Sequence, residues 1–195
     1  MPNQLVIIPL RPSNRGTGQI SFVRDVYGKS VTLVTPKSRV PFPVGSYEET
    51  LGAQKLAMCV TDVAFEARLR ELDQAAVEHI GTSDVLLIPL VKKKGDYDPI
   101  VKATVNAKTK VVIMGEDDSV VRRDGKLSDI KPGCTVKARF KISCIYVLSN
   151  KKYGVSLFAK NVAVWPPLSE TSSESEEEWD PLADEVATKK RKLTK

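Results

Sequence analysis

The segment that most constrains the fold is the run 135–147, TVKARFKISCIYV, in which apolar and polar residues alternate. Alternation is the period of a β-strand, whose successive side chains point to opposite faces. The turn 149–152 and a second run of this kind, 153–165, follow, so the two runs predict a long hairpin. One face of the first strand would be apolar and the other polar. The apolar series is Val136, Ala138, Phe140, Ile142 and Cys144, and the polar series is Lys137, Arg139, Lys141 and Ser143.

The remaining segments predict short strands and one helix. Asp62 can cap a helix that carries apolar residues at three- and four-residue steps up to Ile80, and Gly81 ends it. The strands are expected at 4–8, 19–26, 30–35, 55–61, 85–91, 100–105 and 110–114, and residues 115–128 are expected to form a charged loop. This order predicts a mainly β fold, an oligonucleotide-binding-fold barrel with one inserted α-helix. A split barrel or a β-sandwich would give a similar pattern.

The end of the chain differs from its body in composition. Pro166 and Pro167 close the folded part, after which residues 169–187 carry eight acids and no base and residues 188–195 carry five bases and no acid. Few residues of this stretch are apolar, so it cannot bury enough surface to fold. We therefore expect one domain, 1–168, followed by a disordered regulatory tail, 169–195, that is acidic and then basic.

Composition argues for a binding protein without a cofactor or a bound metal. The body has 25 Lys plus Arg against 16 Asp plus Glu, a balance that attracts polyanions. The three cysteines stand at scattered spacings, His79 has no second histidine, and no phosphate-binding glycine loop or hydrolase motif is present. The start of the chain lacks the features of a secretory signal, and no apolar run is long enough to span a membrane. We expect an intracellular protein that is not an enzyme and has no membrane partner.

The polar face of the hairpin is the candidate binding surface. Cations can follow the phosphates of a single strand, while an aromatic face stacks on any base for about 1 to 3 kcal/mol. The candidate nucleic-acid-binding residues are Lys137, Arg139, Lys141, Phe158, Lys160, Lys102, the loop Lys92, Lys93 and Lys94, and the rings of Tyr146 and Tyr153. In the alternative reading the cations form an ordinary solvated face, Phe158 belongs to the core, and the tyrosines close the ends of the barrel.

Several segments in fixed order resemble a known family. They are the helix with Leu69 and Leu72-Asp73, Pro-Leu-Val-Lys at 89–92 followed by Tyr97-Asp98-Pro99 and Lys102, and the closing strand pair with Lys-Pro-Gly at 131–133 and Tyr153-Gly154. Over residues 30–165 the chain resembles the phage-type single-stranded DNA-binding proteins of nucleocytoplasmic large DNA viruses. The resemblance implies a barrel that coats single-stranded DNA in viral replication, recombination and repair. It also implies an acidic tail that contacts replication proteins and competes with DNA.

The tail departs from that family because it does not end on its acidic stretch. Lys189, Lys190, Arg191 and Lys192 follow and look like a nuclear localisation signal, so we expect the host nucleus or a viral replication compartment. An exposed strand or a swapped tail could pair two copies into a homodimer. Two rival functions stay open at this point, a barrel-shaped interaction subunit of a transcription or chromatin complex and an RNA-binding barrel.

Overall fold

The computed structural model describes residues 5–13, 18–45, 54–81 and 84–167. The predicted boundary at 168 and the tail 169–195 lie outside the described residues. The described helices are α1 (Val63–Ile80) and a short 3-10 helix, η1 (Leu127–Asp129). The strands are β1 (Leu5–Ile7), β2 (Arg11–Pro12), β3 (Gln19–Ser21), β4 (Val23–Asp25), β5 (Thr32–Val34), β6 (Ser38–Arg39), β7 (Gln54–Cys59), β8 (Leu86–Ile88), β9 (Val91–Lys92), β10 (Ile100–Val105), β11 (Lys110–Met114), β12 (Val120–Gly125), β13 (Thr135–Val147) and β14 (Lys152–Trp165).

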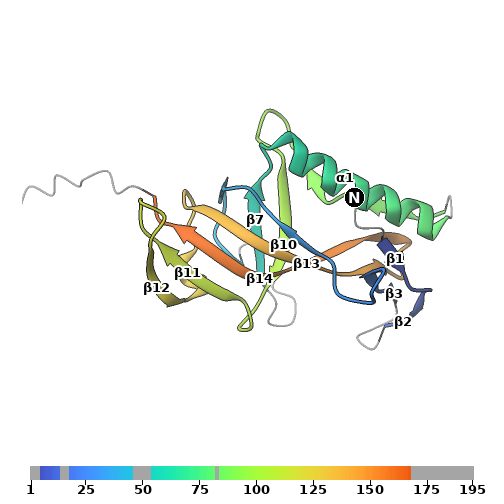
Figure 1. The fold of residues 1–195 in the computed structure, drawn as a ribbon. Helices are drawn as coiled ribbons and strands as arrows, with labels where there is room; N and C mark the ends of the chain where they lie inside the picture. Colours follow the sequence, from blue (N-terminus) through green and yellow to red (C-terminus); the bar gives the residue numbers. More distant parts are fainter. Residues whose placement is uncertain (1–4, 14–17, 46–53, 82–83, 168–195) are drawn as a thin grey trace, which may run out of the picture.

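The predicted long hairpin is present and forms the trunk of the sheet. β13 and β14 pair antiparallel from Thr135 opposite Trp165 to Val147 opposite Tyr153, and they run along the length of the body (Figure 1). β3, β5 and β6 pair with β13, whereas β8, β10 and β11 pair in parallel with β14. Six short strands therefore take their position directly from the hairpin.

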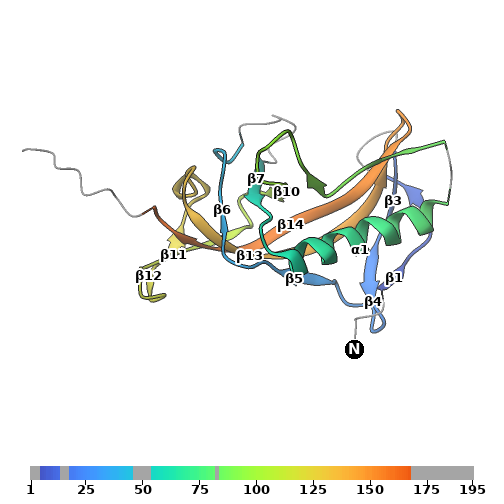
Figure 2. The ribbon, with the colours of Figure 1, turned by 90° about the horizontal axis from the view of Figure 1, so that it is seen from above.

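The other strands attach to these six. β2 pairs with β3, β7 and β9 pair with β10, and β12 pairs with β11, which completes a 12-stranded sheet among the described residues. β1 and β4 form a separate two-stranded ribbon. Figures 1 and 2 show the large sheet strongly curved, with α1 beside it. The predicted mainly β class with one inserted α-helix is confirmed.

One face of the curved sheet holds the core. Along β13, Val136, Ala138, Phe140 and Ile142 are all buried, and the lysines and arginine between them are not. Side chains of β14, the neighbour of β13, and of β7 and β10 belong to the same core. Their members in the core are Leu56, Met58, Val101, Ala103, Val105, Tyr153, Val155, Leu157, Ala159, Val162 and Val164. We call the opposite side of the sheet its outer face.

Two irregularities in the hairpin register change which side chains face outward. The pairing skips Ser143 on β13, so Ile145 reaches the core and Cys144 is only half-buried; the expectation that Cys144 faces the core was wrong. The pairing also skips Lys160 on β14, which leaves Lys160 and Asn161 exposed in succession. A β-bulge has this effect because the extra residue shifts the alternation by one.

The inserted helix begins and ends where the sequence predicts. The Asp62 side chain accepts a hydrogen bond from the Phe65 backbone N–H at 2.6 Å, and Gly81 ends the helix with φ 62°, a left-handed conformation that glycine adopts without strain. α1 buries Phe65, Leu69, Leu72, Asp73 and Ala76 and packs against β14 and β9. No helix in the described ranges is long and apolar enough to cross a membrane.

Several predicted boundaries differ from the observed ones. The segment 19–26 divides into β3 and β4, and 85–91 contains β8 and the start of β9. The segment expected to be a charged loop contains β12 and leads into η1. β12 is exposed along almost its whole length, so it has no buried apolar face that an alternation pattern could reveal.

Asp73 is the charged residue that α1 buries. It is 8% exposed, its Oδ2 accepts a hydrogen bond from the Leu90 backbone N–H at 2.9 Å, and its buried Oδ1 has no hydrogen-bond partner. Burial raises the pKa of this carboxyl, and the Leu90 hydrogen bond opposes the rise. Asp73 therefore ties the helix to the start of β9 at an electrostatic cost when it is ionised.

We predict that this cost appears as a pH-dependent difference in stability between the native chain and Asp73→Asn. Because the native state holds the carboxyl proton more tightly than the unfolded state, native stability falls as pH rises from about 4, the ordinary pKa of Asp, through the raised value. The amide that replaces the carboxyl cannot ionise, so the variant does not lose this stability. The free energy of unfolding of the variant minus that of the native chain should therefore increase over this pH interval. Urea unfolding of both proteins at pH values from about 4 to about 7 measures this difference in the free energy of unfolding. A difference that does not change with pH would contradict the prediction.

Candidate nucleic-acid interface

A row of side chains crosses four strands on the outer face. Lys141 on β13 pairs with Phe158 on β14, Phe158 pairs with Thr104 on β10, and Thr104 pairs with Lys55 on β7. Residues opposite each other in neighbouring strands share a face and lie about 5 Å apart. The Lys55 ammonium also donates a hydrogen bond to the Thr104 hydroxyl at 2.9 Å. The structure therefore places the Phe158 ring between Lys141 of β13 and Lys55 of β7.

Phe158 belongs to this outer row and not to the core. It is half-buried, and its strand neighbours Leu157 and Ala159 are the residues that enter the core. The predicted position of Phe158 beside the cations of β13 is thus observed, whereas the alternative of a core phenylalanine is not.

A hollow, which we call the Lys55 groove, opens on the outer face beside this row. Its volume is about 280 Å³. Three lysines, Lys55, Lys92 and Lys102, line it together with the ring of Tyr146. Its other lining residues are Ile88, Pro89, Leu90, Leu148, Val155, Ser156 and Leu157. Lys92, Lys102 and Tyr146 were predicted from the sequence, and the fold brings them together.

Gly154 shapes the Lys55 groove by letting Tyr146 lie across β14. A Cβ atom at Gly154 would stand 2.9 Å from the Tyr146 hydroxyl and 2.9 Å from the Ile88 carbonyl oxygen. Any side chain here would therefore displace the Tyr146 ring or β8. Its neighbour Tyr153 points the other way, is 4% exposed and belongs to the core. The prediction that Tyr153 offers a surface ring is corrected, because alternation along β14 directs it inward.

A second and larger hollow, which we call the Tyr97 groove, adjoins the first and shares Lys92 and Lys102 with it. Its volume is about 630 Å³. Its remaining lining residues are Arg39, Pro41, Phe42, Lys94, Tyr97, Asp98 and Ile100. Tyr97 is 79% exposed, and the Arg39 guanidinium pairs with Asp98 at 3.5 Å. Two aromatic residues and four cations therefore border one hollow that contains a single carboxylate.

The ladder of cations predicted on β13 continues from the row. Lys137 and Arg139 are exposed and Lys141 is half-buried, all on the outer face. Arg139 pairs with Asn161 on β14, and Asn161 pairs with Lys110 on β11, which brings a further lysine beside the ladder. Lys160 is exposed at the bulge in β14.

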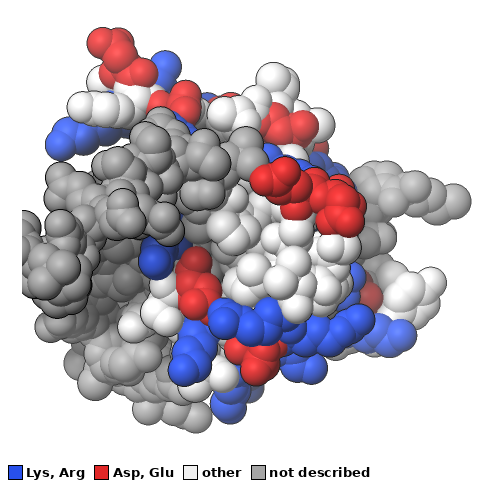
Figure 3. Space-filling model, turned by 90° about the vertical axis from the view of Figure 1, so that its left-hand side faces the viewer, with Lys and Arg blue, Asp and Glu red and all other residues white. Residues whose placement is uncertain are grey.

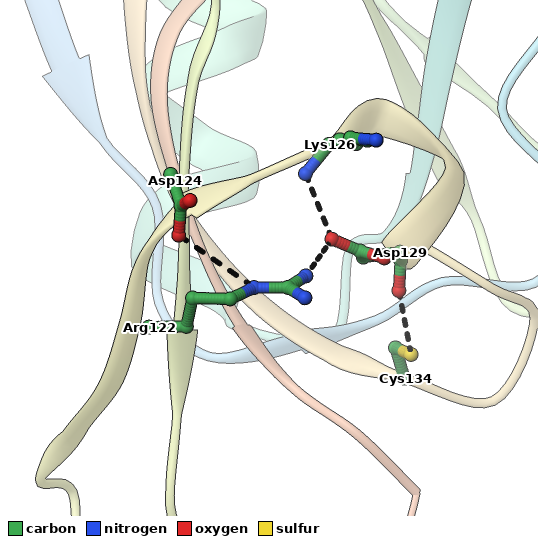
Figure 4. Close-up of polar contacts among 5 residues, drawn as sticks. All are labelled: Arg122, Asp124, Lys126, Asp129 and Cys134. Atoms are coloured by element: carbon green, nitrogen blue, oxygen red, sulfur yellow. Dashed lines mark hydrogen bonds and ion pairs between the residues drawn. The ribbon is translucent and has the colours of Figure 1, made fainter.

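At the β11–β12 end of the molecule, Arg122 is instead paired with nearby acids. Arg122 pairs with Asp129 and, at 3.9 Å, with Asp124 (Figure 4). The pKa of the Asp129 carboxyl is lowered mainly by the hydrogen bond that it accepts from the Lys126 backbone N–H, and also by Arg122. Figure 3 looks onto this end and shows acidic and basic side chains next to one another.

A similar pairing occurs around Asp118. Lys37 pairs with Asp118 at 2.5 Å and lies 4.2 Å from the centre of the Trp165 ring, and the Trp165 indole N–H donates to Asp118 at 2.8 Å. Among the described residues, by contrast, no acid forms an ion pair with Lys92, Lys94, Lys137, Arg139, Lys141 or Lys160. Lys92 and Lys94 of the grooves and the cations of the ladder therefore keep charge that a polyanion can use.

The described residues contain no cluster of three or more His, Cys, Asp or Glu that could hold a metal ion. His79 Nε2 lies 2.9 Å from the hydroxyl of Ser21, a buried residue of β3, and so ties the end of α1 to the sheet. Cys59 is buried beside the Tyr97 groove, and burial raises the pKa of its thiol.

Sequence reasoning missed four residues of this surface, namely Lys55, Arg39, Phe42 and Tyr97. Lys55 stands alone at the start of an apolar strand, so only the pairing with Thr104 reveals its place. Arg39 and Phe42 come from a proline-rich stretch with no periodic pattern. Tyr97 follows the three-lysine loop, and this combination of an aromatic with neighbouring cations was an available signal.

The comparisons with known proteins place this architecture among phage proteins. No family model and no curated protein matches the chain. Among solved structures, a C-terminal truncation of the single-stranded DNA-binding protein from bacteriophage Enc34 aligns with a TM-score of 0.52 and 13% identity over 80% of this chain and 95% of that one. The same phage protein in complex with single-stranded DNA aligns with a TM-score of 0.50 and 12% identity, over 80% and 93%.

Gp2.5, a single-stranded DNA-binding protein encoded by bacteriophage T7, aligns with a TM-score of 0.48 and 14% identity over 80% of this chain and 95% of that one. The Enc34 alignments show that the chain has the fold of a phage-type single-stranded DNA-binding protein, and the predicted oligonucleotide-binding-fold barrel is confirmed.

The contact between Gly154 and Tyr146 predicts a specific steric coupling. Gly154→Ala should lower the free energy of unfolding by about 1 to 3 kcal/mol, because the new methyl group meets the Tyr146 hydroxyl and the Ile88 carbonyl. Tyr146→Phe removes the hydroxyl. It should therefore lower the free energy of unfolding less in the Gly154→Ala background than in the native chain. Denaturant unfolding of the native chain, the two single variants and the double variant gives this coupling. Additive losses would mean that Tyr146 does not lie over Gly154.

Proposed function

We propose that this chain is a non-enzymatic, sequence-tolerant single-stranded DNA-binding protein that holds the strand on the outer face of its barrel. The observation that carries the proposal is the continuity of one surface. The row from Lys141 through Phe158 to Lys55 leads into the Lys55 groove, and that groove shares Lys92 and Lys102 with the Tyr97 groove. Cations and aromatic rings alternate along this path, as sequence-tolerant binding requires.

The residues of the path divide into two roles. The phosphates would follow the cations of the ladder and grooves, together with Lys93 and Lys160, through interactions that release counterions. The bases would stack on Phe158 and Tyr146, and on Tyr97 and Phe42 in the larger groove. A solved neighbour of this fold that holds single-stranded DNA supports the class of ligand.

The finer biology is part of the same proposal and rests on the sequence. We assign the chain to viral DNA replication, recombination and repair, on its resemblance to the single-stranded DNA-binding proteins of nucleocytoplasmic large DNA viruses. The acidic tail would contact replication proteins, and the protein would act in the host nucleus or a viral replication compartment. A homodimer is compatible with this role.

The test of the proposal is competition and salt titration with the full chain. A labelled single-stranded oligonucleotide should be displaced by unlabelled single-stranded DNA far better than by duplex DNA or RNA. Equal or better displacement by RNA would replace DNA with RNA as the ligand. Absence of binding to any nucleic acid would favour an interaction subunit of a transcription or chromatin complex.

We predict that the triple variant Lys137→Ala, Arg139→Ala and Lys141→Ala binds single-stranded DNA more weakly and with a flatter salt dependence. Each lost phosphate contact should reduce the slope of log K against log salt by about 0.7. The double variant Arg68→Ala and Arg70→Ala is the control, because both arginines lie on α1 and pair with acids there. A folded triple variant with an unchanged slope would make the ladder a solvated face only.

The companion variant Phe158→Leu separates stacking from charge. Leucine keeps much of the apolar packing but has no aromatic face. The free energy of binding single-stranded DNA should therefore become less favourable by about 1 to 3 kcal/mol, while the slope of log K against log salt stays the same. Thermal unfolding of the variant checks that the fold is retained. Unchanged affinity would remove Phe158 from the binding surface.

Nuclear import is predicted from the four basic residues near the end of the chain. A fluorescent reporter that carries residues 180–195 should accumulate in nuclei, whereas the same reporter with Lys189, Lys190, Arg191 and Lys192 changed to Ala should not. Microscopy of transfected cells measures the distribution. Equal distribution of the two reporters would contradict the prediction and leave the segment as a basic end that contacts DNA.

A further inference from the structure

A second cationic and aromatic cluster lies at the β1–β4 end of the molecule. The Arg11 guanidinium carbon lies 4.2 Å from the centre of the Phe22 ring, and that of Arg24 lies 5.3 Å from it. Both distances are in the range of a cation–π contact, for which about 6 Å is the limit. Arg11 comes from β2, Arg24 from β4, and Phe22 from the link between β3 and β4. We call these three residues the Arg11 cluster.

Strand pairing connects the Arg11 cluster to the Lys55 groove. Arg11 pairs with Ile20 on β3, and Ile20 pairs with Tyr146 on β13, whose ring lines the groove. Residues paired in this way share one face of the sheet, so Arg11 lies on the same face as Tyr146. The two residues are two strands apart, which is about 10 Å at the usual strand spacing. Phe22 shares this face because it follows Ile20 by two positions and contacts Arg11.

No acid among the described residues pairs with the guanidinium groups of the Arg11 cluster. Within the described ranges, Arg11 and Arg24 form no ion pair. The Arg24 guanidinium donates hydrogen bonds to the Ser30 hydroxyl at 3.3 Å and to the Val23 carbonyl oxygen. The carboxylate of the β4 turn, Asp25, accepts from the backbone N–H groups of Tyr27 and Lys29. Two guanidinium groups therefore flank one ring without a carboxylate partner among the described residues.

We propose that the single-stranded DNA path leaves the Lys55 groove over Tyr146 and ends on the Arg11 cluster, which forms a second contact site for the strand. This inference rests on the proposed function. A base can stack on the flat plane of a guanidinium group, as it can on an aromatic ring. Unlike the ring, the guanidinium group is charged and can also pair with a phosphate. The Arg11 cluster can thus hold a nucleotide beyond those that the grooves hold. In the alternative, the stack only fastens β2 against β4.

The distinguishing property of such a site is that only longer strands reach it. Affinity should be measured for oligothymidylates that increase from about 4 to about 16 nucleotides, the range of site sizes of one oligonucleotide-binding barrel. Arg11→Ala should leave binding of the shortest bound oligomer unchanged and weaken that of the longest about five-fold or more. Lys92→Ala, in the grooves, should weaken binding at every length. Arg68→Ala on α1 is the charge control and should have no effect at any length.

Arg11→Lys separates stacking from charge in this experiment. It should keep the salt dependence of the native chain with long oligomers but lose part of the affinity, since an ammonium has no flat face. Thermal unfolding of both Arg11 variants checks the fold. If folded Arg11→Ala loses affinity equally at all lengths, or at none, the second site is overturned. The effect of Lys92→Ala still shows in that case whether the grooves bind the strand. If the native chain binds no oligomer, the proposed function fails, and this inference fails with it.

Discussion

The pairing of β13 with β14 is the interaction on which the rest of the structure depends. Of the described strands, six pair directly with this hairpin, and the others pair with those six or, like β1 and β4, with each other. One face of the hairpin supplies much of the core, and the other supplies the cations and Phe158. Stability and the candidate interface therefore come from the same strands. A substitution on the outer face can alter charge without opening a cavity, because the apolar side chains between the outer residues continue to fill the core.

Charge is distributed unevenly in a way that net charge does not reveal. At the β11–β12 end, Arg122 pairs with Asp124 and Asp129, and Lys37 pairs with Asp118, whereas the grooves contain a single carboxylate, Asp98, with Arg39 beside it. Exposed ion pairs contribute little to stability. Their main effect here is to reduce the attraction of Arg122 and Lys37 for a polyanion. The overall charge of +6 therefore does not reveal which cations a nucleic acid could use.

Features with a strong local period could be predicted from the sequence. The hairpin, the helix with its Asp62 and Gly81 ends, and the outward ladder on β13 all follow from alternation or three- and four-residue spacing. The bulges at Ser143 and Lys160 could not be predicted, because they depend on how two strands match in length. The bulge at Ser143 determines where Cys144 points. Lys55 and Arg39 were missed for a related reason. Their role arises from pairing between segments far apart in the chain, and no local pattern marks it.

The position of the hairpin in the chain has a consequence for biosynthesis. β3, β5 and β6 leave the ribosome before residue 135, yet their partner is β13, and β8, β10 and β11 must wait longer for β14. β8, β10 and β11 therefore lack their partner in the hairpin until nearly 165 residues have been made. Strands that wait for distant partners fold slowly and expose unpaired edges to other chains. The hairpin that joins the two halves of the sheet is therefore completed last, and the edges that pair with it stay unpaired until then.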